Sequence, residues 1–150
     1  MISTGRIMML FAGVFFALAS FSVTAPASQT DYLSPSAIVA DSDGKTLYIA
    51  EETANQVAVF DVAGGKVEKA ISLPGRPSGL ALAPDGKTLY VTIAAAEGSV
   101  QIVDLKAGES VAKIKAGHTP TAPVVSPDGK TLYFCNRFNI RYWWPYRKVD

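Results

Sequence analysis

The sequence contains few side chains that are able to do chemistry, and two of them occur once each. His118 is the only histidine and Cys135 is the only cysteine. They lie in different segments and make no metal site, since a zinc ion in a protein takes about four ligands. A Cys-x-x-Cys-His haem attachment motif is absent, no Ser-His-Asp set can be assembled, and no glycine-rich loop precedes a helix. The sequence therefore predicts no catalytic, cofactor-binding or metal-ligating residues.

Two interpretations stay open for each of these side chains, which are the weak functional candidates of the sequence. His118 stands in Gly117-His118-Thr119-Pro120, which matches the earlier Gly75-Arg76-Pro77 and predicts a surface loop. Functional groups also lie on such loops, so a functional role remains the alternative. Cys135 is expected to be a buried thiol that packs as a small apolar side chain. The alternative is a reactive or interchain thiol, because an odd cysteine is unusual in an exported protein.

Three acidic residues recur in the same heptapeptide context, in which serine or proline precedes Asp-Gly-Lys-Thr-Leu-Tyr. Each turn offers one carboxylate, whereas calcium takes about six to eight oxygen ligands, so a calcium site is not favoured. Aspartate accepts hydrogen bonds from its own backbone in turns, and glycine accepts positive φ. We therefore interpret the recurring positions as structural: Asp43, Gly44, Tyr48, Asp85, Gly86, Tyr90, Asp128, Gly129 and Tyr133.

The spacing of these heptapeptides defines a repeat, because the aspartates are separated by 42 and then 43 residues. In the second unit we expect four short strands, at 80–83, 88–92, 100–103 and 110–114. No segment after residue 27 keeps an apolar period of 3.6 with helix caps, so helices are not expected there. Four strands per unit and a period in the low forties predict an all-β fold, a partial β-propeller of four-stranded blades.

The repeat resembles the YVTN family of β-propeller repeats. Tyr90-Val91-Thr92-Ile93 is nearest to the signature, and variants stand at 48–51 and 133–136. The resemblance covers residues 35 to about 139 and implies a seven-bladed ring, found in exported bacterial and archaeal surface-layer proteins. The motif is specific for the fold and gives almost no information about function.

The chain is expected to divide into a signal peptide helix at 1–27, a short leader at 28–34, blade repeats at 35–76 and 77–119, a partial repeat at 120–139 and a tail at 140–150. The tail replaces the expected strand with Tyr142-Trp-Trp-Pro-Tyr146, and proline does not donate to a sheet ladder. Our hypothesis is a truncation or frameshift after about Asn139. The alternative is a genuine basic, aromatic tail that binds a membrane surface or a partner.

The first 27 residues have the pattern of an export signal. Arg6 precedes an apolar run of 15 residues, 7–21, and Ala25-Pro26-Ala27 fits a cleavage site. The run is shorter than the roughly 20 residues that span a bilayer, so no stable transmembrane span is expected in the mature chain, although an uncleaved anchor remains the alternative. The chain is therefore expected in the periplasm, outside the cell or at the cell surface. Without Arg6 it carries 13 basic and 13 acidic residues, which argues against nucleic-acid binding through bulk charge.

These observations favour an exported, non-catalytic propeller module that acts as a scaffold for an unknown protein or small ligand, with no cofactor. The alternative is a fragment of a propeller enzyme, lactonase-like or a cofactor-bearing oxidoreductase, whose active-site residues lie in missing blades. Uncovered blade faces predict a chain that is poorly stable alone or self-associates. The adjacent Glu51 and Glu52 are expected to be solvated.

Overall fold

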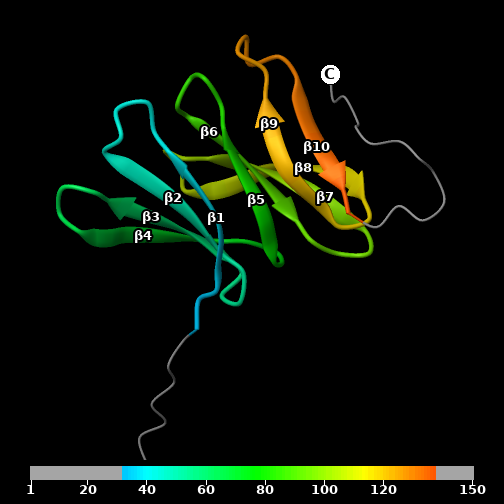
Figure 1. Cartoon of the computed structure of the whole chain (residues 1–150), viewed down its shortest axis with the longest axis horizontal. Coiled ribbons are helices and arrows are strands. Elements are labelled where there is room, and N and C mark those ends of the chain that lie inside the picture. The colour runs from blue at the N-terminus through cyan, green and yellow to red at the C-terminus, as the bar shows by residue number, and fades with distance from the viewer. Residues whose placement is uncertain (1–31, 138–150) are drawn as a thin grey trace, which may run out of the picture.

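The computed structural model of the chain describes residues 32–137, which form three antiparallel sheets (Figure 1). The first sheet, blade 1, has the order β1-β2-β3-β4, the second, blade 2, has the order β5-β6-β7-β8, and β9 and β10 form a two-stranded sheet. The strands are β1 (Pro35–Ala40), β2 (Thr46–Glu51), β3 (Gln56–Asp61), β4 (Lys66–Ser72), β5 (Pro77–Leu82), β6 (Thr88–Ile93), β7 (Gly98–Asp104), β8 (Glu109–Gly117), β9 (Pro120–Val125) and β10 (Leu132–Asn136). The predicted all-β fold with four-stranded blades is confirmed.

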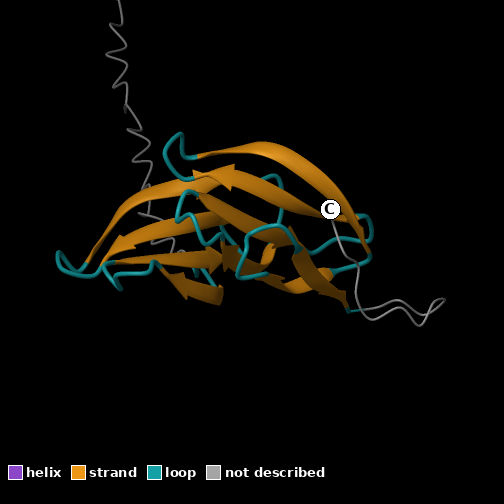
Figure 2. Cartoon of the chain, turned by 90° about the horizontal axis from the view of Figure 1, so that it is seen from above, coloured by secondary structure: helices purple, strands orange, loops and turns teal. Residues whose placement is uncertain are grey.

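Several predicted features lie outside the described residues. These are the signal peptide at 1–27, the leader as far as residue 31, the last two residues of the partial repeat, 138–139, and the tail at 140–150. Between residues 32 and 137 the chain contains strands and loops (Figure 2), and no helix there is long and apolar enough to cross a membrane.

The inner strand of blade 2 begins three residues earlier than the sequence indicates, at Pro77. A register shift between Pro77 and Gly79 lets this segment pair with the end of β6. Glycine is required at position 79 because a Cβ there would stand 2.5 Å from Cδ of Pro123 and 3.0 Å from the backbone nitrogen of Ala122. The close approach of β5 to β9 therefore depends on the missing side chain.

Each blade has two different apolar faces, because successive side chains of a strand point to opposite sides. The Leu-Tyr dipeptide of β2, β6 and β10 puts leucine on one side, here called the leucine face, and tyrosine on the other, here called the tyrosine face. The tyrosine face of blade 1 packs on the leucine face of blade 2, where Tyr48 and Val57 meet Leu89, Val91 and Val103.

A second cluster repeats this arrangement one blade further along. The tyrosine face of blade 2, with Tyr90, Val100 and Ile114, packs on the leucine face of the β9–β10 sheet, with Leu132 and Phe134. The core therefore lies between sheets rather than within one sheet, as in a stack of blades.

The inner strands β1, β5 and β9 lie next to one another through the β1–β5 and β5–β9 contacts (Figure 1). The outer strands β4 and β8 are mostly exposed and carry lysines at positions 66, 69, 113 and 115. Charged side chains on an edge strand oppose pairing with another chain. The blades therefore stack through their faces, and their outer edges stay solvated.

Candidate ligand-binding site

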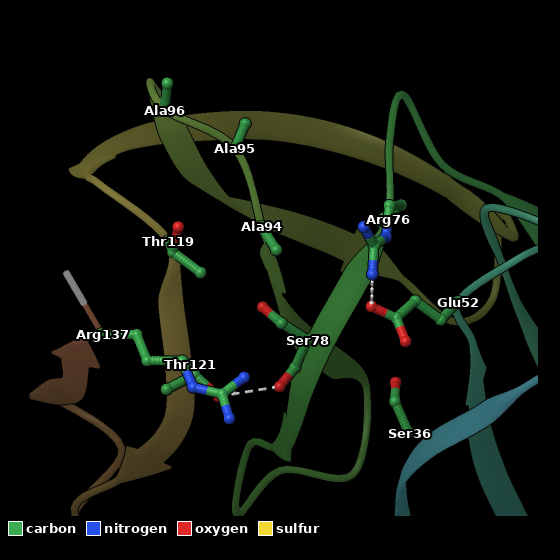
Figure 3. Close-up of a pocket in the computed structure, with 10 residues that line it drawn as sticks. All are labelled: Ser36, Glu52, Arg76, Ser78, Ala94, Ala95, Ala96, Thr119, Thr121 and Arg137. Carbon is green, nitrogen blue, oxygen red and sulfur yellow. Dashed lines mark hydrogen bonds and ion pairs between the residues drawn. The ribbon is translucent and has the colours of Figure 1, made fainter.

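A cavity of about 650 Å³ lies where the inner strands begin and the second strands of the blades end (Figure 3). All three sheets contribute to it. It is lined by Ser36, Glu52, Arg76, Ser78, Ala94, Ala95, Ala96, Thr119, Thr121 and Arg137.

One backbone hydrogen bond, repeated in every sheet, shapes the rim of this cavity. The N–H that follows the second strand donates to the carbonyl that precedes the first strand. The pairs are Glu52 to Ser34 at 3.0 Å, Ala94 to Arg76 at 2.9 Å and Arg137 to Thr119 at 3.0 Å. Equivalent positions of the repeat are thus brought to one rim, where they carry glutamate, alanine and arginine.

Hydroxyl groups join the inner strands beneath the rim. Ser36 Oγ donates to the carbonyl of Pro77 at 3.1 Å, and Ser78 Oγ lies 2.5 Å from the carbonyl of Pro120. Thr121 Oγ1 donates in the opposite direction, to the carbonyl of Ser78 at 2.9 Å. Because each bond crosses from one sheet to the next, these hydroxyls hold the sheets together and make the floor of the cavity polar.

The charged side chains of the cavity are two arginines and one glutamate. Arg76 forms an ion pair with Glu52 (Figure 3), which offsets one positive charge. Arg137 forms no ion pair with any residue between 32 and 137, so its guanidinium carries the excess positive charge of the lining. A guanidinium presents a planar set of N–H donors that matches a carboxylate or a phosphate. The lining is therefore suited to a small anion.

The expectation that both Glu51 and Glu52 are solvated is wrong for Glu51, which is 6% exposed. Strand alternation puts Glu51 on the leucine face of blade 1, and Gln56 Nε2 donates to its Oε2 at 2.5 Å. The hydrogen bond satisfies a carboxylate that burial would otherwise destabilise. Glu52, one residue further, turns to the cavity instead.

The repeated aspartates lie in the turns between the first and second strands. Asp85 Oδ1 accepts from the N–H of Lys87 at 2.8 Å, and Asp128 Oδ1 accepts from the N–H of Lys130 at 3.1 Å. Ser126 Oγ donates to Asp128, and this bond, together with the Lys130 N–H, holds the pKa of the Asp128 carboxyl below its usual value.

Blade 1 uses a different aspartate for the same purpose. Asp41, rather than Asp43, accepts the N–H of Lys45, at 2.8 Å, while Asp43 forms an exposed ion pair with the Lys45 ammonium group. Desolvation opposes the charged form of Asp41, but hydrogen bonds from Thr46, Lys45 and Gly44 outweigh it and lower its pKa. The turn of each sheet is therefore held by a carboxylate, although its position in the repeat differs.

The remaining repeat positions are split between turns and sheet faces. Gly44, Gly86 and Gly129 have positive φ of 68°, 66° and 72°. Tyr48 is 8% exposed, and burial, with a smaller contribution from the charge of Asp41, raises its pKa. Tyr133, at the equivalent place on β10, is 41% exposed.

The two weak functional candidates do not line the cavity. His118 is exposed in the turn between β8 and β9, where its Nδ1 lies 2.8 Å from Thr119 Oγ1. Cys135 is a half-buried free thiol on β10. Within residues 32–137 no three histidine, cysteine, aspartate or glutamate side chains are close enough to hold a metal ion.

Sequence reasoning missed the residues that meet at the cavity, although several of them occupy equivalent positions of the repeat. Ser36, Ser78 and Thr121 each follow the proline that opens a unit, and Arg76 precedes one. Alignment of the units would have shown that the fourth residue after each Leu-Tyr varies in charge, as at Glu52, Ala94 and Arg137. That variation at a fixed place of the repeat was the available signal.

The stacked four-stranded sheets, with inner strands side by side and a polar cavity at one end of them, define a β-propeller, of which residues 32–137 form two blades and part of a third. Residues 12–107 match the model of the family described as "Lactonase, 7-bladed beta-propeller". The chain belongs to this family.

Comparison with individual proteins agrees with the fold. The chain superposes on hydrazine synthase of Kuenenia stuttgartiensis with a TM-score of 0.72 and 30% identity, over 85% of this chain and 36% of that chain. A protein of Bacteroides fragilis, provisionally described as a 6-phosphogluconolactonase, gives a TM-score of 0.63 and 24% identity, over 71% of this chain and 33% of that chain. At that identity the likeness shows the fold alone.

A curated relative is similar over a shorter stretch. Antigen Lp49 of Leptospira interrogans serogroup Icterohaemorrhagiae serovar copenhageni is 34% identical over 55 residues, which are 37% of this chain and 12% of that protein. The chain therefore spans about a third of the solved structures it matches and a smaller share of this relative.

Proposed function

We propose that the chain is part of an exported, non-catalytic propeller of the YVTN type, a scaffold that binds a small anion in the cavity at the end of its inner strands. The observation that carries this proposal is Arg137, a guanidinium on the rim of a cavity of about 650 Å³ whose floor is made of hydroxyl groups. Arg76, already paired with Glu52, would add hydrogen bonds and little net charge.

The chemistry of the lining supports an anion rather than an apolar ligand. Ser36, Ser78 and Thr121 already donate their hydroxyl hydrogens to carbonyl groups, so their oxygens offer lone pairs to donor groups of a ligand. A carboxylate or phosphate that also carries hydroxyl groups satisfies both the guanidinium and these oxygens. Charge-assisted hydrogen bonds to arginine contribute about 1.5–3 kcal/mol each.

Calorimetric titration with inorganic phosphate and with a small hydroxycarboxylate, gluconate, tests the proposal. Arg137→Gln should weaken binding at least about tenfold, which corresponds to about 1.4 kcal/mol. Lys130→Gln is the matched control, because it also removes one positive charge but lies in the turn between β9 and β10. Equal weakening by both variants, or no binding of either probe, would contradict an anion site at this rim.

Export is the second part of the proposal and rests on Arg6, the apolar run at 7–21 and Ala25-Pro26-Ala27. A bacterial host that expresses the whole chain should deliver it outside the cytoplasm with a new N-terminus near Ser28. Retention in the cytoplasm at full length would refute export, and an uncleaved chain in the membrane fraction would identify an anchor instead.

Catalysis is the second candidate function, and the family description together with Glu52 favours it. Glu52 is a carboxylate at the cavity next to an arginine, an arrangement suited to hold water beside a polarised carbonyl group. An assay of gluconolactone hydrolysis, measured through the acid that is released, distinguishes the two candidate functions. Turnover that is lost in Glu52→Gln would support a lactone hydrolase, whereas binding without turnover supports the scaffold.

A further inference from the structure

A second, smaller cavity of about 300 Å³ lies on blade 2, beside its outer strand β8. Its walls come from the loop between β6 and β7, the start of β7 and the second half of β8. Glu97, Ser99, Lys113 and Lys115 line it, together with small residues at positions 96, 98 and 117. Of these, only Ala96 also lines the larger cavity, so the loop between β6 and β7 separates the two cavities.

The polar side chains from β7 and β8 share one face of blade 2. Val100 and Ile114 pack on the β9–β10 sheet, so strand alternation puts Ser99, Lys113 and Lys115 on the opposite, leucine face. Lys115 stands opposite Ser99 in the register of the two strands. Blade 1 packs on this face without contributing to the cavity lining. Blade 2 therefore has a neighbouring sheet on each side, and further blades of a ring would leave this cavity open.

A chain of hydrogen bonds orients the buried serine of the smaller cavity. Ser99 is 8% exposed, and Gln101 Nε2 donates to its Oγ at 3.0 Å. Gln101 is 3% exposed, and Ser110 Oγ donates to its Oε1 at 2.9 Å. The Ser99 oxygen thus serves as an acceptor, whereas its hydrogen is donated to no acceptor among residues 32–137. A hydroxyl group is also a donor, so the cavity contains a buried donor that lacks an acceptor.

Two lysines and one glutamate carry the charge of the smaller cavity, which gives its lining one excess positive charge. Lys113 and Lys115 lie two residues apart on the same side of β8, and both are exposed. Neither lysine, nor Glu97, forms an ion pair with a residue in the described range 32–137. Each ammonium group is a compact charge with three donors, which suits the several acceptor oxygens of a tetrahedral anion.

We propose that this cavity is a second binding site, independent of the cavity at Arg137, and that it takes a small phosphate monoester. The ammonium groups of Lys113 and Lys115 and the hydroxyl of Ser99 hold the phosphate, whose terminal oxygens accept a hydrogen bond from each. A volume of about 300 Å³ stands at the lower end of the range of about 300–1,000 Å³ for ligand pockets, so the organic part is small. Glu97 accepts a hydrogen bond from a hydroxyl group of that part and opposes a second phosphate.

Nuclear magnetic resonance titration of the isotope-labelled chain with glycerol 3-phosphate tests the proposal. The chain carries Arg137→Gln, so that the anion site proposed for the larger cavity does not contribute. Sodium chloride at equal ionic strength controls for screening of the lysines. The amide signals of Ser99 and Lys115 should move along one saturation curve with the phosphate ester and stay in place with chloride. Equal movement in both titrations, or no movement in either, would overturn the proposal.

Four single substitutions in the same background locate the binding. Lys113→Gln and Lys115→Gln should each weaken it about tenfold, as expected for loss of a hydrogen bond to a charged group. Lys87→Gln, an exposed lysine in the turn between β5 and β6, is the matched control and should leave binding unchanged. Glu97→Gln should strengthen binding, because it removes a negative charge beside the phosphate. Equal weakening by Lys87→Gln and Lys113→Gln, or weaker binding in Glu97→Gln, would refute the assignment.

A phosphate monoester also occurs as a lipid headgroup, so sedimentation with vesicles that contain phosphatidic acid separates the two sources. The proposal expects the chain to bind glycerol 3-phosphate and to stay in solution with the vesicles, since the cavity is small. Capture by the vesicles that Lys113→Gln abolishes, without binding of glycerol 3-phosphate, would overturn the small-molecule site in favour of a membrane surface.

Discussion

Truncation of the repeated leucine should cost very different amounts of stability in the two complete blades. Leu89 is 0% exposed between blade 1 and blade 2, whereas Leu47, at the same place in the repeat, is half-buried on an uncovered face. Replacement of both by alanine removes the same atoms from the same kind of strand. The difference between the two variants therefore measures the effect of one covering blade.

The magnitude follows from burial. Leu89→Ala loses the transfer free energy of the side chain and leaves a cavity, which costs about 2–5 kcal/mol for leucine in a core. Full burial of a leucine side chain contributes about 1.5–3 kcal/mol of transfer free energy, and Leu47→Ala loses about half of it. The replacement leaves little cavity, because solvent fills the space. We expect Leu89→Ala to destabilise the fold by about 2 kcal/mol more, which is about a thirtyfold change in the unfolding equilibrium constant.

Urea unfolding followed by circular dichroism measures both free energies, provided that the slopes of the transitions agree. The chain should be dilute, so that no contact between copies covers Leu47 and raises the cost of its replacement. Equal losses in dilute solution would refute the reasoning, since they would show that the leucine face of blade 1 is covered as well as that of blade 2.

Three further predictions concern the turns and the close approach of the inner strands. Gly79→Ala puts a methyl group against Pro123 and should destabilise the chain by about 1–3 kcal/mol in urea unfolding, so an unchanged midpoint would contradict the close approach. Asp85→Ala should lower the melting temperature by a few degrees, because two backbone N–H groups lose their acceptor, whereas Asp43→Ala should leave it unchanged. The backbone N–H groups of Ala107 and Lys106 donate to Asp104 and lower its pKa below 3.8. The stability that the Asp104 carboxylate contributes is therefore present above pH 3.8 and is lost as the pH falls through the lowered pKa. A chain that is equally stable in strong acid would contradict this.

The fold was largely predictable because its signals are local and repeated. The Asp-Gly-Lys turn and the alternating strand that follows it depend on neighbouring residues, and three copies at nearly constant spacing made the blade evident. Even so, blade 1 uses Asp41 where the repeat suggests Asp43. Two carboxylates two residues apart are equally plausible acceptors in a sequence, and only the backbone path of the turn distinguishes them.

The candidate site was much less predictable, because its residues come from three sheets. Ser36 and Arg137 are separated by most of the described chain but line one cavity, since the inner strands lie side by side. The two residues that sequence reasoning selected for their rarity, His118 and Cys135, lie elsewhere. Rarity of a side chain carries no information about its neighbours in space, whereas the register of the repeat does.

The sequence by itself determined the class of fold, the period of the blades and which side of each strand is apolar, because turns and strand alternation are properties of short segments. The tertiary structure decided which apolar faces are covered, which acidic side chain is buried and which polar residues meet. Leu89 and Leu47 both stand in the sequence Asp-Gly-Lys-Thr-Leu-Tyr, yet a neighbouring sheet covers only Leu89. Glu51 and Glu52 are adjacent, yet Glu51 is buried beside Gln56 whereas Glu52 lines the cavity. Burial depends on what packs against a strand, and that neighbour comes from a distant part of the chain.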